Sequence, residues 1–334
     1  FKATRPDDLL VAALKGALAQ VSQLDPAAIE DVVVGCAMPE AEQGLNVARM
    51  AVLLAGWPNS IAGVTVNRFC ASGLTAVQMA ADRIRLGEAD ILVAGGCESM
   101  SMVPMSGNTP SLSPGIFKDE NIGIAYGMGL TAEKVAQQWK VSREVQDAFA
   151  LASHQKALAA QAAGEFSAET FMVQVAQRKM NLALGEVDIS WQPFTQDEGP
   201  RADTSLEGLA KLRAVFAARG SVTAGNSSQT SDGAGALLIA SEKALKQFNL
   251  TPVARFVSFA IKGVAPEIMG IGPKEAIPAA LRLAGLKQAD IDWIELNEAF
   301  AAQGLAVLRM LGLKDDDERV NAWGGAIALG HPLG

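Results

Sequence analysis

The sequence is poor in the residues that most often bind metals or cross-link a chain. Its 334 residues include three cysteines and two histidines. An odd number of cysteines without metal-ligand spacing excludes a disulfide framework and indicates free thiols in a reducing compartment, for which we expect the cytoplasm. Two histidines are too few for a multi-histidine site, so we expect no metal.

Positive charge is also scarce. The 28 Lys and Arg residues are outnumbered by 36 Asp and Glu residues, which gives a formal net charge of −8. This charge repels a phosphate backbone, so we expect no nucleic-acid partner. No apolar run approaches the roughly 20 residues that span a bilayer, so we expect no membrane partner. An anionic ligand would need a local cluster of basic side chains.

The remaining composition is that of a globular chain. Hydrophobic residues make up 49% and charged residues 19% of the sequence, which indicates extensive burial. The length favours two domains or one doubled domain. We expect a longer protein, because the first residues enter a helix without an initiator Met and the last, GHPLG, stop in a turn. The sequence leaves open whether a targeting segment precedes Phe1.

Cys70 lies at a predicted junction between a strand and a helix. Val64 and Val66 predict a short strand, and residues 71–86, rich in Ala, Leu and Met, predict a helix that ends at Gly87. The first N–H groups of a helix carry the positive end of its dipole, so we expect the pKa of the Cys70 thiol to be lowered. The alternative is a buried cysteine that acts as a small hydrophobe.

A nucleophilic cysteine needs a base. His331 lies in a glycine-rich turn that presents its side chain, whereas His154 lies within a regular helical pattern that is typical of a packing residue. A Cys–His pair suits acyl transfer, because the imidazole takes the thiol proton and the thiolate attacks a carbonyl. Asn297, in a loop after a predicted strand, could donate to the developing oxyanion or simply cap a helix.

One pattern occurs twice. Gly44, Leu45, Arg49 and Met50 match Gly304, Leu305, Arg309 and Met310 at a constant shift (304 − 44 = 260), each set after a predicted strand, 32–34 and 293–296. Val-Asn pairs at 66–67 and 320–321 then open further strands. This repeat predicts two similar α/β halves, whose packing would bring Cys70 and His331 toward a common axis.

The middle of the chain interrupts this repeat. Residues 101–121 are turn-rich, and helices are predicted over 131–139, 143–163 and 206–216, with a loop over 192–201 and a strand over 236–240. We therefore expect an N-terminal half over 1–100, completed by about 217–248, an inserted loop domain over 101–216, and a C-terminal half over 249–334.

Five motifs resemble those of the thiolase family, and they cover nearly the whole chain in that family's order: NRFCASGLTAVQMAADRIRLGEADILVAGGCESMS, YGMGLTAEKVA, VTAGNSSQTSDGAGALL, ELNEAFAAQ and GGAIALGHPLG. The resemblance implies an α/β fold of duplicated halves in five α-β-α-β-α layers, with an inserted loop domain. It implies that Cys70 is acylated, that His331 activates it, and that Asn297 fixes a catalytic water at the oxyanion site. It places a second catalytic cysteine beyond Gly334, at the position of the second half that corresponds to Cys97 in the first. We expect Cys97 itself to be structural.

The resemblance also implies a coenzyme A site and no tightly bound cofactor. Its matching positions are Arg201, Phe216 and Ser228 along the coenzyme channel and Met128, Ala224 and Phe300 near the pantetheine path. Arg201 with Lys211 and Arg213 could supply the basic cluster that an anionic coenzyme needs.

The implied reaction is thiolysis of a 3-ketoacyl-CoA to acetyl-CoA and a shortened acyl-CoA, as in fatty-acid β-oxidation. Gly127 stands where many acetoacetyl-CoA-forming members carry His, which favours the degradative reaction over that alternative. A ketosynthase fits less well because His154 is poorly placed as a second histidine, and a non-catalytic acyl-CoA or lipid-binding relative remains a rival. The family resemblance implies a homodimer or homotetramer, with 101–121 as a candidate tetramer contact.

Overall fold

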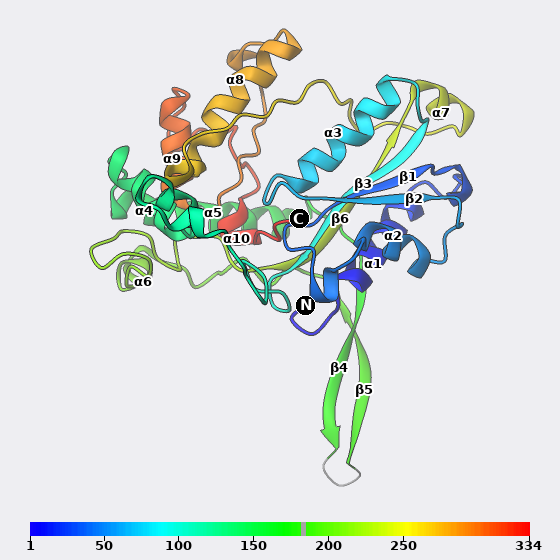
Figure 1. The fold of residues 1–334 in the computed structure, drawn as a ribbon, viewed down its shortest axis with the longest axis horizontal. Helices are drawn as coiled ribbons and strands as arrows, with labels where there is room; N and C mark the ends of the chain where they lie inside the picture. The colour runs from blue at the N-terminus through cyan, green and yellow to red at the C-terminus, as the bar shows by residue number, and fades with distance from the viewer. Residues whose placement is uncertain (182–184) are drawn as a thin grey trace.

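The computed structural model describes residues 1–181 and 185–334, and Figure 1 shows their arrangement. The helices are α1 (Pro6–Ala19), α2 (Val47–Leu54), α3 (Ser72–Arg85), α4 (Met128–Gln138), α5 (Arg143–Ala163), α6 (Leu206–Ala210), α7 (Glu242–Gln247), α8 (Gly272–Ala284), α9 (Ala301–Met310) and α10 (Ala326–Leu329). The strands are β1 (Asp31–Gly35), β2 (Ala62–Val66), β3 (Ile91–Ser99), β4 (Val173–Asn181), β5 (Glu186–Phe194) and β6 (Asp232–Ala240).

The first half is built on a sheet in the order β2-β1-β3-β6, parallel except for β6. β1 is apolar on both faces, as a central parallel strand must be. Val32 and Val34 pack in a core with helices α1 and α2, whereas Val33 faces a second core with helix α3. Helices therefore cover both sides of the sheet, as Figure 1 shows for α3 and for α1 with α2.

β6 joins this sheet from more than 130 residues further along the chain, since Ile91 pairs with Ala240 and Ser99 with Asp232. The expected strand over 236–240 is confirmed, and it begins four residues earlier. The expected helices over 71–86 and 143–163 are also present, and α5 ends at Gly164 in the left-handed region, φ 75°.

The second half repeats the first only in outline. Ile294 bridges Val320 in parallel, as β1 pairs with β2, but the expected strands over 293–296 and 320–321 do not extend beyond this bridge. The side chain of Asn321 accounts for part of this difference, because its amide both accepts from Leu296 N (2.8 Å) and donates to Leu296 O (2.8 Å). The Asn321 side chain thus forms the two hydrogen bonds with Leu296 that the backbone of a neighbouring strand would otherwise form.

The repeated helices also start differently. Gly304 and Leu305 lie within helix α9, whereas Gly44 and Leu45 precede helix α2. Leu45 has a φ of 55°, which a continuous helix does not allow. The shared sequence signature therefore marks the same position along the chain but not the same local structure.

The inserted segment departs from expectation in its hairpin and in helix α6, whereas residues 101–121 are turn-rich as expected. β4 and β5 form a hairpin that projects from the body in Figure 1, and its last residues occupy part of the loop expected over 192–201. Helix α6 ends at Ala210 and not at 216, because the Arg143 guanidinium donates to the carbonyl oxygens of Leu209 and Leu212 (2.5 and 3.0 Å). Residues 101–121 form turns and short 3-10 helices, η3 (Pro114–Phe117) and the start of η4 (Asp119–Ala125).

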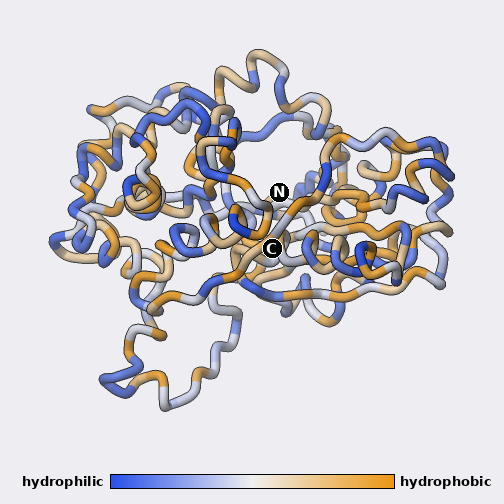
Figure 2. The backbone as a smooth tube through the Cα atoms, turned by 90° about the horizontal axis from the view of Figure 1, so that it is seen from above, coloured by the Kyte–Doolittle hydropathy of each residue, from blue (hydrophilic) through white to orange (hydrophobic). Residues whose placement is uncertain are grey.

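Figure 2 shows both chain ends near the middle of the molecule, between two bodies in which hydrophobic and hydrophilic residues alternate along the backbone. Within the described residues, every helix is too short or too polar to cross a membrane. The meeting point of the two bodies is where the predicted site residues must be sought.

Candidate active site

Cys70 lies in a tight turn between β2 and helix α3. The residue before it, Phe69, has a φ of 45°, an unfavourable conformation for a side chain of its size. The turn is held by Asn67 Oδ1, which accepts from Phe69 N (2.8 Å), and by Ser72 Oγ, which accepts from Arg68 N (2.8 Å) and donates to Phe69 O (2.6 Å). The sequence thus builds a fixed, strained turn that leaves Cys70 exposed.

The thiol itself is not activated in the way expected. Desolvation by the surrounding protein raises the pKa of Cys70, and the charge of Glu98 raises it further, while a backbone hydrogen bond at Cys70 opposes them. The expected lowering by the helix start is therefore wrong. Part of the side chain faces solvent, but the protein around the sulfur outweighs the backbone hydrogen bond that would lower its pKa. A neutral thiol of this kind needs a separate base to become a nucleophile.

A seam of glycines brings the chain end beside this turn. A Cβ on Gly35 would lie within 2.7 Å of Ser72 and Gly73, so only glycine lets helix α3 start this close to β1. A Cβ on Gly96 would lie 2.5 Å from the carbonyl oxygen of Gly334, and one on Gly73 would lie 3.3 Å from it. The segment that follows His331 therefore lies between β3 and the start of helix α3. This helix begins two residues after Cys70 in the sequence.

His331 is buried, and burial lowers its pKa. Its backbone N–H donates to Ser231 Oγ (2.9 Å), and its Nε2 lies 3.1 Å from Asn297 Nδ2. With the amide nitrogen toward the ring, Asn297 donates and Nε2 accepts, so the second ring nitrogen carries the proton of the neutral imidazole. The structure brings Asn297 and His331 together across 34 residues. Within the described residues, no hydrogen bond joins Cys70 to His331.

Several residues expected along the coenzyme channel and the pantetheine path also converge. Phe216 packs on Gly129, next to Met128 at the start of helix α4, so closely that a side chain at Gly129 would overlap its ring. The rings of Phe216 and Phe300 stand edge to face with centroids 6.0 Å apart. Ser228 N donates to Ala299 O (2.9 Å), which places it beside Phe300.

The other two expected coenzyme-binding residues lie on neighbouring loops. Ala224 is exposed in the turn that leads to Ser228. Arg201 is exposed, and its backbone N–H donates to Nδ1 of His154 (3.1 Å) on helix α5. Burial, followed by the charge of Arg201, lowers the pKa of His154. His154 is therefore a buried residue that anchors the Arg201 loop through a hydrogen bond. The helical sequence pattern around His154 did not predict this role.

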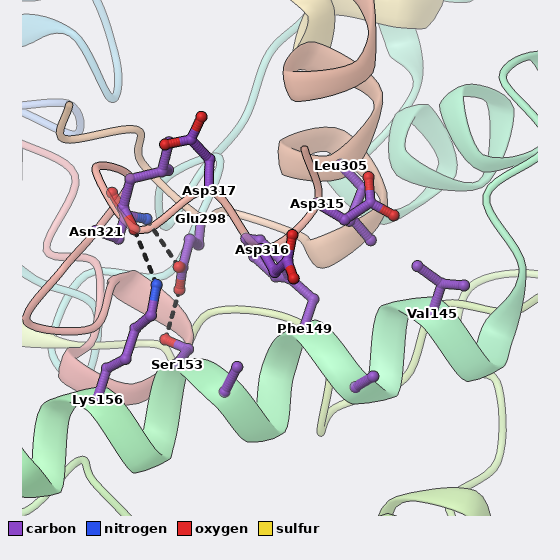
Figure 3. A pocket seen from close by; sticks show the side chains of 13 residues that line it. Val145, Phe149, Ser153, Lys156, Glu298, Leu305, Asp315, Asp316, Asp317 and Asn321 are labelled. Carbon is purple, nitrogen blue, oxygen red and sulfur yellow. Dashed lines mark hydrogen bonds between the residues drawn. The ribbon is translucent and has the colours of Figure 1, made fainter. Parts of the chain in front are cut away.

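A buried carboxylate, whose burial the sequence did not predict, lies next to Asn297. Glu298 is 2% exposed and lines a cavity of about 200 Å³ between helix α5 and residues 315–317. Figure 3 shows it between Ser153 and Asn321, with both bonds drawn. From the sequence alone, Glu298 could orient a neighbouring residue or simply be solvated, and its burial rules out the second interpretation. Its place in a short motif between apolar residues was the signal available.

Two other features bear on chemistry. Cys97 is buried and in hydrogen-bonding contact with Cys36, the residue opposite it at the ends of β3 and β1, and this contact raises its pKa well above the usual range. Over residues 1–181 and 185–334, no group of three or more His, Cys, Asp or Glu side chains could hold a metal ion.

Comparison with known families matches the whole of this arrangement. The thiolase N-terminal domain model matches residues 1–243, and the thiolase C-terminal domain model matches residues 250–334. Together they include the Cys70 turn in the first domain and both Asn297 and His331 in the second.

Individual relatives agree. The chain is 49% identical over 331 residues to the 3-ketoacyl-CoA thiolase of Bacillus subtilis, covering 99% of this chain and 83% of the relative, and 46% identical over 349 residues to the beta-ketoadipyl-CoA thiolase of Pseudomonas aeruginosa, covering 100% and 84%. Human mitochondrial 3-ketoacyl-CoA thiolase has a similar structure, with a TM-score of 0.87 at 38% identity, over 100% of this chain and 84% of that one. Bacillus anthracis acetyl-CoA acetyltransferase follows with a TM-score of 0.85 at 36% identity, over 99% and 83%. The chain therefore belongs to the thiolase family, which makes it an acyltransferase.

Proposed function

We propose that this thiolase cleaves 3-ketoacyl-CoA with free coenzyme A, and that Cys70, His331 and Asn297 carry the chemistry. The observation that supports the assignment most directly is the contact between Asn297 and His331 in a segment whose end packs against the start of helix α3, beside the Cys70 turn. Two polar groups from distant parts of the sequence are in contact, and the segment that carries one of them ends beside the Cys70 turn, which an acyl-binding protein without turnover would not require.

The roles follow from the protonation states. Burial raises the pKa of Cys70 and lowers that of His331, so near neutral pH the nucleophile is a thiol and the base a neutral imidazole. Nε2 of His331 exchanges the Asn297 amide for the Cys70 thiol and takes the thiol proton as the sulfur attacks the keto carbon. The bond between C2 and C3 of the substrate then breaks, acetyl-CoA leaves as its enolate and is protonated, and Cys70 keeps the acyl group. The thiol of coenzyme A attacks this thioester, gives the shortened acyl-CoA and returns the proton to Cys70.

Asn297 and the start of helix α3 serve the charge that develops on oxygen. Asn297 holds a water or the thioester oxygen beside His331, and backbone N–H groups near Cys70 face the tetrahedral oxyanion. Donors fixed before the reaction stabilise such charge more than mobile water does.

Coenzyme A enters as a substrate and leaves as part of the shortened acyl-CoA. No tightly bound cofactor takes part in the cycle. The aromatic contact of Phe216 with Phe300, beside Met128 and Ser228, offers an apolar path for the pantetheine arm. Arg201, Lys211 and Arg213 are all exposed and supply cations for the phosphates.

The test is the decay of the magnesium-acetoacetyl-CoA enolate absorbance on addition of coenzyme A. Wild type should consume the substrate, Cys70→Ala should not, and Cys36→Ala, which removes a thiol outside the site, should behave as wild type. Coenzyme A binding without any Cys70-dependent decay, for acetoacetyl-CoA and longer substrates alike, would show the binding protein to be the correct alternative.

The acyl chain is longer than acetoacetyl in our proposal. An added Cβ at Gly127 meets no atom within 4 Å, so the approach beside Met128 is open. Gly127→His should therefore lower turnover of a long-chain 3-ketoacyl-CoA more than turnover of acetoacetyl-CoA. An unchanged ratio between the two substrates would favour the acetoacetyl-CoA-forming alternative, which structural similarity to an acetyl-CoA acetyltransferase also keeps in view.

Assembly and location complete the proposal. We place the enzyme in the cytoplasm, as a homodimer or homotetramer. The segment over 101–121 exposes Met105, Leu112 and Phe117, which a partner subunit would cover. Its deletion should lower the mass measured by light scattering from that of a tetramer to that of a dimer.

A further inference from the structure

Glu298 has an environment that its neighbours in the active site do not explain. Its side chain is 2% exposed, and burial is the main cause that raises its pKa. Its Oε2 accepts from Ser153 Oγ (2.6 Å) and from Ile327 N (3.3 Å), and its Oε1 accepts from Asn321 Nδ2 (2.8 Å). Both carboxylate oxygens are thus occupied by donors, although the residue lies one position after Asn297.

These donors come from three separate segments. Ser153 belongs to helix α5, Asn321 follows the bridge to Ile294, and Ile327 lies in the first turn of helix α10. Figure 3 shows the Glu298 carboxylate between Ser153 and Asn321 at the wall of the cavity. The carboxylate therefore joins the loop of Asn297 to the helix that ends immediately before Gly330 and His331.

The surrounding chain is shaped for this contact. Gly325 has no side chain, and a Cβ there would overlap the Glu298 carboxylate. Its N–H donates to Ser153 Oγ (3.1 Å), so the hydroxyl that donates to Glu298 also accepts from the turn before helix α10. Asn321 in turn binds both backbone groups of Leu296. Asn297 and His331 thus depend on one bonded cluster.

We propose that Glu298 is a positioning residue that sets the contact between Asn297 and His331 and keeps the His331 ring desolvated. This role rests on the proposed function and adds to it a residue that acts only through others. The charged group that faces Glu298 from helix α5 is Lys156, whose Nζ donates to Val320 O (3.0 Å). The lowered pKa of His331 is caused by burial, so the position of the ring, and not the charge of Glu298, should control it.

The experiment compares Glu298→Gln and Glu298→Asp with Glu295→Gln in the full chain. Glu295 is a matched control, because it is an exposed carboxylate three residues earlier that accepts from Trp293. The chain contains two histidines, so protein labelled with ¹³C-histidine gives two imidazole signals, and loss of one in His331→Ala assigns the other to His154. The pKa of His331 is then measured without any need for turnover.

Positioning and charge give opposite results. If Glu298 acts by position, Gln and Asp both loosen the loop, the ring becomes hydrated, and the pKa of His331 rises toward the ordinary value of about 6.5. If it acts by charge, Gln lowers that pKa further and Asp leaves it unchanged. A fall in Glu298→Gln, or no change in either variant, would overturn the proposal.

Turnover supplies the second readout. Misplacing Asn297 and His331 should lower kcat by about 10²-fold, while KM for coenzyme A stays the same. Protection of the buried Cys36 and Cys97 from alkylation counts the folded molecules, so a loss that vanishes after correction for that count would mean a role in folding alone. Ser153→Ala removes one of the three donors and is used if the Glu298 variants do not fold. Wild-type protein without thiolysis would refute the proposed function, yet the His331 titration would still decide the role of Glu298.

Discussion

The amide nitrogen of Asn297 lies 3.1 Å from Nε2 of His331, although 34 residues separate them in the sequence. The contact holds the imidazole in one orientation and leaves its Nε2 as an acceptor. A ring oriented in this way can take a proton from a thiol only when neutral, and burial keeps it neutral by lowering its pKa. The pair therefore links geometry to protonation state, and both can be tested.

Asn297→Ala should lower kcat for thiolysis by about 10² to 10³-fold, the usual effect of removing one donor from an oxyanion site. KM for the acyl substrate should change little, because the lost interaction forms mainly in the transition state. Initial rates with acetoacetyl-CoA check this, with Asn59→Ala, at an exposed position, as control. A variant with wild-type kcat would remove Asn297 from the mechanism.

The pH profile of kcat/KM should report both pKa shifts. Because the pKa of His331 is lowered, activity should persist below the ordinary histidine value of about 6.5 before it falls as the ring becomes protonated. Because the pKa of Cys70 is raised, alkylation of this cysteine in His331→Ala should increase only above the ordinary thiol range of about 8.5. Rapid alkylation of that variant at neutral pH would instead mean that helix α3 alone activates the thiol.

The Cys70 turn and helix α5 could be predicted because their signals are local. A short strand, small residues and an Ala-rich helix place Cys70 at a junction, and a glycine at 164 ends α5 where its left-handed φ requires one. The contact between Asn297 and His331 is long-range and has no local signal, and the internal repeat predicts only that His331 lies near Cys70.

Other features depend on tertiary structure. Helix α6 is cut short by the side chain of Arg143, more than 60 residues away, and the pKa of Cys70 is set by how much protein surrounds the sulfur. The β4–β5 hairpin had a weak local signal, since Val187, Ile189 and Trp191 alternate with polar residues, but its apolar face is exposed and resembles no buried strand. Glu298 could not be identified because its partners come from three segments.

Arg201→Ala should raise KM for coenzyme A and leave kcat nearly unchanged, since a phosphate contact binds ground state and transition state alike. Lys246→Ala, which removes an exposed cation from helix α7, is the matched control. The effect should weaken at high salt, because exposed charges are screened over about 10 Å at 0.1 M ionic strength. Equal KM values in the two variants would assign the coenzyme phosphates to other cations, of which Lys211 and Arg213 are next to be tested.

Gly325→Ala should destabilise the fold by about 1–3 kcal/mol, the usual cost of overpacking, because its Cβ would overlap the Glu298 carboxylate. Gly263→Ala is the control, since a Cβ there meets no atom within 4 Å. Urea denaturation of both variants measures the free energy of unfolding. Protein that remains folded should also show a lower kcat, because displacement of Glu298 moves the loop of Asn297 and the segment before His331. If the variant is less stable but its folded fraction is fully active, Glu298 matters for packing and does not influence the site. If the two variants are equally stable, the turn before helix α10 accommodates the added Cβ without a loss in the free energy of unfolding.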